Sequence, residues 1–164
     1  MKDKLKLRLY IKENLEKPTL KKAKAAFKEI DNCYEASVGT VNINDFIKQK
    51  NSYNDFQTML FKLIDERNLK DSDVYNKVHI DRRLFSKIRN NNLYHPSKET
   101  IILLGLSLEL NEQEIEDLLE SASYSLPKNN YYDLIIRFCF INKIYKISKV
   151  NDLLNEYNCK LFSY

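Results

Sequence analysis

The side chains best suited to binding a charged ligand are arginines and lysines gathered in one short stretch. Between Lys77 and Lys98 the sequence contains six basic residues and a single acid, Asp81. Arginine can donate paired hydrogen bonds to a phosphate or to the O6 and N7 atoms of guanine, and lysine can neutralise a phosphate. The stretch therefore indicates binding to a polyanion, although a merely solvated surface would show the same charges.

A run of acids follows the basic stretch. Residues 109–120 contain six acids and no base. The net charge of +4 is accordingly divided, with +5 on residues 1–50 and −2 on residues 101–150. Such a polarised molecule could be oriented on a polyanion, but two solvated faces would give the same distribution.

Residues with catalytic or metal-binding spacing are scarce. The chain has two histidines, His79 and His95, and no H-E-x-x-H, C-x-x-C or G-x-S-x-G motif. Two glycines in 164 residues argue against a glycine-rich phosphate loop. The cysteines, Cys33, Cys139 and Cys159, lack the spacing of metal ligands. We therefore expect a protein that is not an enzyme, with no catalytic residue, metal or cofactor.

The apolar runs and the cysteines of the sequence indicate in which cellular compartment the protein is expected. The longest apolar runs, 101–106 and 138–141, are too short to cross a bilayer. Residues 1–9 alternate basic residues with leucine and so lack the apolar core of a secretory signal. Three cysteines are typical of reduced thiols in the cytoplasm. These features predict a cytoplasmic protein without a membrane partner.

Apolar spacing predicts five short helices in the middle of the chain. Apolar residues recur there every three or four positions, as on one face of a helix. Asp81, Ser97 and Asn111 are residue types that cap helix N-termini. The helices are expected at 54–67, 71–78 and 81–90, and then from Ser97 and from Asn111 onwards, before Pro127.

The basic N-terminal section, residues 1–50, is expected to be a mostly helical extension. Its first apolar residues alternate at period two, as in a strand: Leu5, Leu7, Leu9 and Ile11. Leu5, Leu9 and Leu15 also allow a helix, so the local pattern leaves both readings open. A stripe with helical spacing follows between residues 20 and 34.

The C-terminal section, residues 128–164, contains an unusually apolar helix at 130–142. Because this helix is apolar nearly all round, it must be buried on more than one side. A second helix is expected to begin at Ser148, which could cap it. We expect these two helices to supply the interface of a homodimer.

Residues 73–90 carry the pattern of a known family. An apolar residue in one helix is followed by a turn residue, an apolar residue, a capping residue and two core residues three apart. Those places are taken by Val74, His79, Ile80, Asp81, Phe85 and Ile88. The stretch resembles the phage-repressor-like (XRE-type) helix-turn-helix family over residues 54–123. The section from Phe56 onwards is also similar to a helical module of bacterial and mobile-element proteins.

The resemblance implies an all-α fold, with a five-helix repressor-like helix-turn-helix core at 53–124 and helical extensions at both ends. It also implies a transcriptional regulator of a bacterium, phage or mobile element that binds double-stranded DNA. In this family the helix corresponding to 81–90 enters the major groove. The side chains expected to contact DNA are Lys77, Arg82, Arg83, Ser86, Lys87, Arg89 and Asn90.

Several residues depart from the family pattern. Tyr75 stands where the family usually has a small residue, and His79 stands where it often has glycine. Asp71 lies at the start of this helix, where the family commonly offers glutamine to a phosphate, and Asp73 follows close behind; carboxylates repel phosphate. A second hypothesis is therefore a protein- or ribonucleoprotein-binding adaptor, or an inhibitor of a host nucleic-acid enzyme, in which the acidic stretch 109–120 imitates a polyanion.

Overall fold

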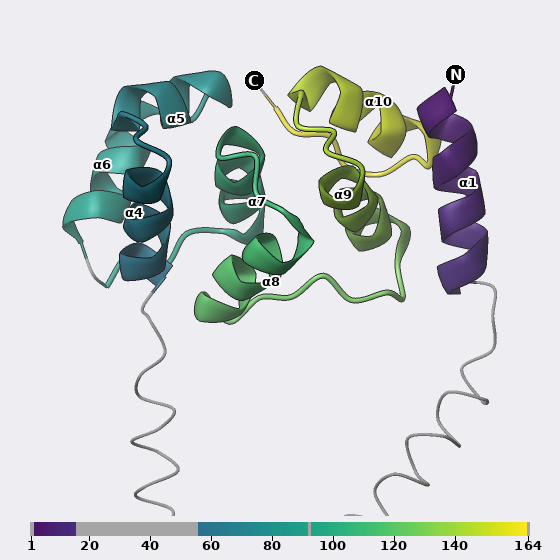
Figure 1. The fold of residues 1–164 in the computed structure, drawn as a ribbon, viewed down its shortest axis with the longest axis horizontal. Helices are drawn as coiled ribbons and strands as arrows, with labels where there is room; N and C mark the ends of the chain where they lie inside the picture. Colours follow the sequence, from purple (N-terminus) through teal and green to yellow (C-terminus); the bar gives the residue numbers. More distant parts are fainter. Residues whose placement is uncertain (1, 16–55, 92, 164) are drawn as a thin grey trace, which may run out of the picture.

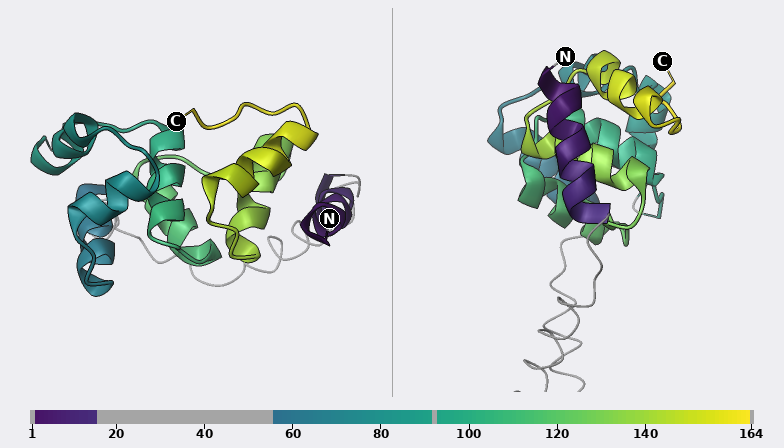
Figure 2. Two further views of the ribbon diagram at one scale, coloured as in Figure 1. Left: turned by 90° about the horizontal axis from the view of Figure 1, so that it is seen from above. Right: turned by 90° about the vertical axis from the view of Figure 1, so that its right-hand side faces the viewer.

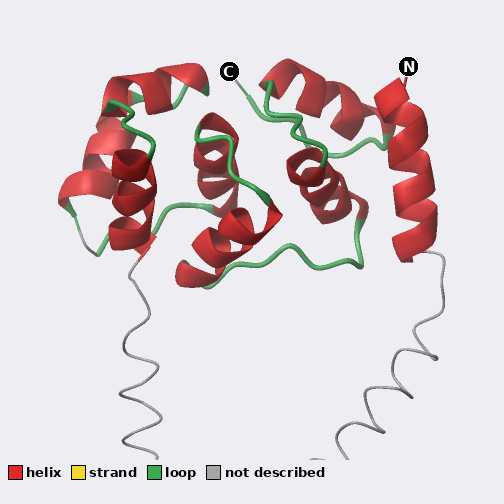
Figure 3. Ribbon diagram, viewed as in Figure 1, coloured by secondary structure: helices red, strands yellow, loops and turns green. Residues whose placement is uncertain are grey.

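The computed structural model describes residues 2–15, 56–91 and 93–163. Within these ranges every regular element is a helix and no strand is present (Figure 3), so the expected all-α class is confirmed. The section boundaries at 1–50, 53–124 and 128–164 stay predictions, and the stripe at 20–34 lies outside the described residues. The helices are α1 (Lys2–Leu15), α4 (Phe56–Glu66), α5 (Asp71–Lys77), α6 (Arg82–Asn90), α7 (Lys98–Ser107), α8 (Glu112–Ser121), α9 (Tyr131–Ile141) and α10 (Ile147–Glu156).

The described helices are arranged along the longest axis of the molecule. Figure 1 and the left panel of Figure 2 place α4, α5 and α6 at one end and α1 at the other, with α7, α8, α9 and α10 between them. Side chains from all of these helices join one apolar core. Because α6 lies at the outer end of the row, its far side faces away from the rest of the described chain.

Three of the expected helix caps are confirmed by hydrogen bonds. The Oδ1 atom of Asp81 accepts from the backbone N–H of Arg83 at 2.6 Å, which fixes the start of α6. Ser97 and Asn111 cap α7 and α8 in the same manner. Each side-chain oxygen satisfies a backbone donor that the first turn of a helix leaves without a partner.

The expected cap at Ser148 is wrong. A cap at Ser148 would start the helix at residue 149, but α10 begins two residues earlier at Ile147, after Lys146, and no side chain caps it. Ile147 is buried in the common core. The helix α10 therefore begins at a residue that packs into the core, and the capping signal at Ser148 did not indicate this start.

Residues 2–15 form a helix, α1. The local spacing of apolar residues did not indicate which side of this helix is buried. In α1, Leu7 and Ile11 are buried, whereas Leu5 and Leu9 are 63% and 58% exposed. Both pairs are four residues apart, so both form a stripe along a helix. The ring of Tyr10 also packs 5.6 Å from that of Phe138 in α9, measured between centroids.

The apolar circumference of α9 is covered by the same chain. Every residue from Asp133 to Phe140 is buried, and α9 contacts α1, α8 and α10. The N-terminal helix α1 thus provides the second surface that the sequence analysis assigned to another copy of the protein. The homodimer stays a prediction, but the apolar helix no longer supports it.

Two charged residues of α9, Asp133 and Arg137, are buried and pair with partly exposed side chains. Lys98 donates to Asp133 at 2.5 Å, and Arg137 forms ion pairs with Glu112 and Glu116. Burial alone would lower the pKa of Arg137, but the two carboxylates raise it overall. Breaking a buried pair leaves a charge without compensation, so these contacts fix how α9 packs against α7 and α8.

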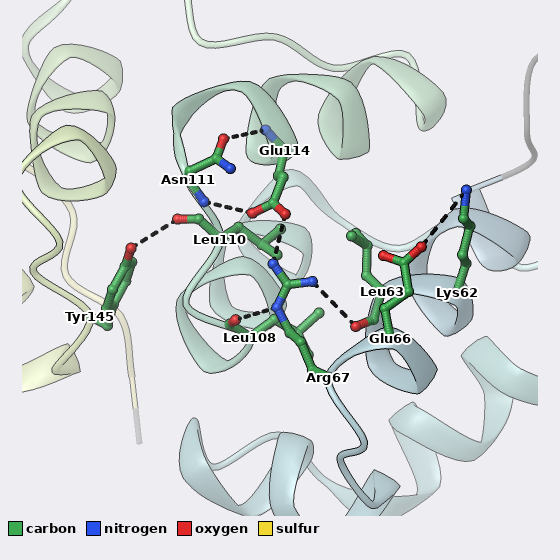
Figure 4. Close-up of polar contacts among 9 residues, drawn as sticks. All are labelled: Lys62, Leu63, Glu66, Arg67, Leu108, Leu110, Asn111, Glu114 and Tyr145. Atoms are coloured by element: carbon green, nitrogen blue, oxygen red, sulfur yellow. Dashed lines mark hydrogen bonds and ion pairs between the residues drawn. The ribbon is translucent and has the colours of Figure 1, made fainter.

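Arg67 joins α4 to the connection between α7 and α8 (Figure 4). Its guanidinium group donates to the carbonyl oxygen of Leu108 at 3.0 Å and to Glu114 at 2.8 Å. Glu114 also accepts from the backbone N–H of Asn111 at 2.8 Å, which completes a capping box at the start of α8. Burial raises the pKa of Glu114, but these two donors outweigh it, and the pKa lies below its ordinary value of 4.5.

We expect Glu114→Gln to destabilise the protein by about 1 kcal/mol at neutral pH, because the charged hydrogen bond to Arg67 is lost. A carboxyl group whose pKa is lowered by folding stabilises the native state above its unfolded pKa, and this contribution disappears as the pH falls through the folded-state pKa. The difference from wild type should therefore shrink below pH 4.5. Urea unfolding of both proteins at a series of acidic pH values measures this difference in the free energy of unfolding.

Glu120→Gln is the matched control, because Glu120 is exposed on the same helix. Its free energy of unfolding should stay within about 0.5 kcal/mol of wild type. Equal effects of the two substitutions at all pH values would contradict the role given to Glu114.

Candidate nucleic-acid interface

The turn between α5 and α6 has the backbone conformation that its sequence suggested. Four residues, 78–81, connect the two helices. His79 adopts a left-handed conformation with φ of 55° at the position where the resembled family often has glycine. The backbone N–H of Ile80 donates to the carbonyl oxygen of Tyr75 at 2.9 Å, and Val78 and Ile80 are buried. These contacts hold α6 at a fixed angle to α5.

The inner face of α6 is anchored by aromatic packing. Phe85 and Ile88 are buried, as the sequence predicted. The ring of Tyr75 lies 5.5 Å from that of Phe85, and the ring of Phe61 lies 6.1 Å from it, measured between centroids. The large residue at position 75 is thus accommodated by packing against Phe85, so it does not prevent the close approach of α5 and α6.

The outer face of α6 carries charges that have no partner in the described part of the chain. Arg82, Arg83 and Lys87 are all exposed. Among the described residues, none of the three side chains takes part in a hydrogen bond, an ion pair or a cation–π contact. These three cations are therefore free, within the described part of the chain, to approach an external anion.

Three further residues of the expected set make polar contacts in the second half of α6. Asn90 donates to the hydroxyl oxygen of Ser86 at 3.1 Å, so these side chains lie together on the exposed surface. Arg89 pairs with Asp71 of α5, with 2.5 Å between Nη2 and Oδ1. Both partners of this pair are partly exposed, and such surface pairs contribute only about 0–1 kcal/mol.

Lys77 has a structural partner that the sequence did not reveal. Its ammonium group donates to the carbonyl oxygen of Ser107, the last residue of α7, at 3.0 Å and to Glu109 at 2.6 Å. A cation at the C-terminal end of a helix satisfies free carbonyl groups there. Of the expected DNA-contacting residues, Lys77 is thus committed to the contact between α5 and α7.

An open pocket of about 400 Å³ lies between the start of α5 and the exposed side of α6. Its cationic lining residues are Lys70, Arg82 and Arg89, and its acidic lining residue is Asp71. Ser86 and Asn90 add hydrogen-bonding groups, together with Ser72. Tyr75 and Phe85 complete the lining, so the pocket has both polar and apolar walls, is open to solvent and carries more positive than negative groups.

The acidic stretch at 109–120 is mostly engaged inside the molecule. Glu109 pairs with Lys77, Glu114 with Arg67, and Glu112 and Glu116 with Arg137. Four of its six acids thus have cationic partners within the chain. This stretch consequently offers an external partner much less negative charge than its composition suggests.

Other candidate chemistry is not visible in the described residues. They contain no group of three or more metal-ligating side chains. Cys139 is fully buried, and burial raises the pKa of its thiol to about 12, which makes it a poor nucleophile. No helix in the described part of the chain has the length and apolar character needed to cross a bilayer.

No family model matches the sequence, and comparisons with curated proteins and with solved structures return no match either. The resemblance to the XRE-type family therefore rests on the residues of α5, α6 and the turn between them that are quoted above.

Proposed function

We propose that this chain is a helix-turn-helix DNA-binding protein, with a repressor-like core in which α6 enters the major groove of double-stranded DNA. The observation that carries the proposal is the division of α6 into two faces. Phe85 and Ile88 are buried, while the neighbouring cations of the outer face are exposed and have no partner among the described residues. A recognition helix needs this combination of a packed face and a free polar face.

Each side chain of the outer face has a role that suits its chemistry. Arg82 and Arg83, in the first turn of α6, can donate pairs of hydrogen bonds to the O6 and N7 atoms of guanine. Lys87 lies one turn further along and is suited to a backbone phosphate. We extend the proposal to transcriptional regulation in a bacterium, phage or mobile element, because the resemblance to the XRE-type family implies that role.

The alternative function, binding of a protein or ribonucleoprotein through an acidic helix, has weaker support. Imitation of a polyanion by the acids of 109–120 was one argument for it, and most of these acids pair with Arg67, Lys77 or Arg137. Purification from the native host without nuclease treatment separates the two functions. Copurifying DNA supports our proposal, whereas a stoichiometric protein partner without DNA would favour the alternative.

We expect Lys87→Ala to weaken binding to duplexes of any sequence and to reduce the salt dependence of binding. Each phosphate contact adds about 0.9 to the slope of log affinity against log salt concentration, so the slope should fall by about that amount. Fluorescence anisotropy titrations of a random-sequence duplex at several salt concentrations measure both quantities.

Lys149→Ala provides the control for the loss of one positive charge. Lys149 is exposed on α10, which lies away from α6 along the row of helices (Figure 1). This variant should keep the wild-type slope. Equal slopes for wild type and both variants would contradict the placement of α6 against DNA.

A further inference from the structure

Asp71 occupies an unusual place for a nucleic-acid interface. It lines the pocket between α5 and α6 together with Lys70, Arg82 and Arg89. Its carboxylate pairs with Arg89, and about a third of its side chain is exposed. A carboxylate in this position both neutralises one cation of the pocket and repels any phosphate that approaches it.

Arg89 is held in place by more than its ion pair. The Cζ atom of its guanidinium group lies 3.9 Å from the centre of the Phe61 ring, a cation–π contact. Its backbone carbonyl accepts a hydrogen bond from Gln57 of α4. If Asp71 is removed, the contact with Phe61 keeps the guanidinium group at the edge of the pocket, so the cation needs little reorganisation to meet a new anion.

We infer that this pocket receives a backbone phosphate of the bound DNA, and that Asp71 competes with this phosphate for Arg89. The inference rests on the proposed function and adds a specificity-determining residue to it. Phosphate contacts do not distinguish sequences, whereas contacts with base edges do. By weakening one phosphate contact, Asp71 lowers the affinity for all DNA and leaves more of the discrimination to Arg82 and Arg83.

The substitution Asp71→Asn tests this competition. It should tighten binding to a random-sequence duplex by about threefold to tenfold, because a surface ion pair no longer opposes the phosphate. The slope of log affinity against log salt concentration should become steeper by about 0.9, the value for one additional phosphate contact.

Asp73→Asn is the matched control. Asp73 is exposed on the same helix, and its carboxylate lies 3.5 Å from the hydroxyl group of Ser72 rather than beside a cation. This variant changes the net charge by the same amount, so it separates general electrostatics from the specific pair with Arg89. It should alter affinity by less than about twofold and leave the salt slope unchanged.

Arg89→Ala completes the experiment as a double-mutant cycle with Asp71→Asn. The gain from Asp71→Asn should disappear when Arg89 is alanine. Equal gains from Asp71→Asn and Asp73→Asn, or a gain that persists without Arg89, would overturn the inference while leaving DNA binding intact. If neither the wild type nor any of these variants binds duplex DNA, the proposed function fails, and the inference fails with it.

Discussion

Replacing Arg82 and Arg83 together with alanine should weaken binding to the preferred DNA sequence by roughly 30-fold or more, because each bidentate contact with a base contributes about 1–3 kcal/mol. Binding to random DNA should weaken less, since it depends on phosphate contacts. The ratio of the two affinities, measured by anisotropy at one salt concentration, should therefore fall. Both arginines are exposed and lack partners among the described residues, so the substitution should leave the fold intact.

A double substitution of Lys128 and Lys149 by alanine removes the same two charges from other exposed positions. It should lower both affinities slightly and leave their ratio unchanged. If the arginine variant and this control have the same ratio of affinities as wild type, α6 does not read sequence through its first turn.

Phe140→Ala should lower the free energy of unfolding by about 3–5 kcal/mol, the usual cost of truncating a buried aromatic residue. Phe140 is 1% exposed, and its ring packs edge-on against that of Tyr145 at 6.3 Å between centroids. The α7 backbone also comes close to it: a Cβ atom added to Gly105 would stand 3.2 Å from the Cζ atom of Phe140. The substitution therefore opens a cavity where α7 and α9 meet.

Ile141→Ala is the control on the same helix, because Ile141 is 42% exposed. Its effect on urea unfolding should stay within about 0.5 kcal/mol. Similar losses from both substitutions would contradict the central position of α9 in the core. A loss below about 1 kcal/mol for Phe140→Ala would contradict it as well.

Local signals in the sequence were sufficient for much of α6. Asp81 is a strong capping residue, and Phe85 and Ile88 are three positions apart on one face, so the start of the helix and its inner side followed from neighbouring residues. His79 could adopt the left-handed turn because the backbone requirement there is also local. The all-α class follows from the same kind of short-range pattern.

Contacts between distant segments could not be read from the sequence. The partners of Lys77 and Arg89, Glu109 and Asp71, are 32 and 18 positions away. Periodicity showed that the helix at 130–142 needed extensive cover, but it could not show that α1 provides it within one chain. The same limit applies within α1, where two equivalent stripes of leucine and isoleucine compete for the core.

Selection from a pool of random duplexes, carried out in parallel with wild type and with the variant lacking Arg82 and Arg83, measures most directly whether the outer face of α6 reads DNA. We expect wild type to enrich a short motif with fixed guanines, and the variant to lose the preference at those positions. Failure of wild type to enrich any motif, or recovery of the same motif by the variant, would contradict the assignment.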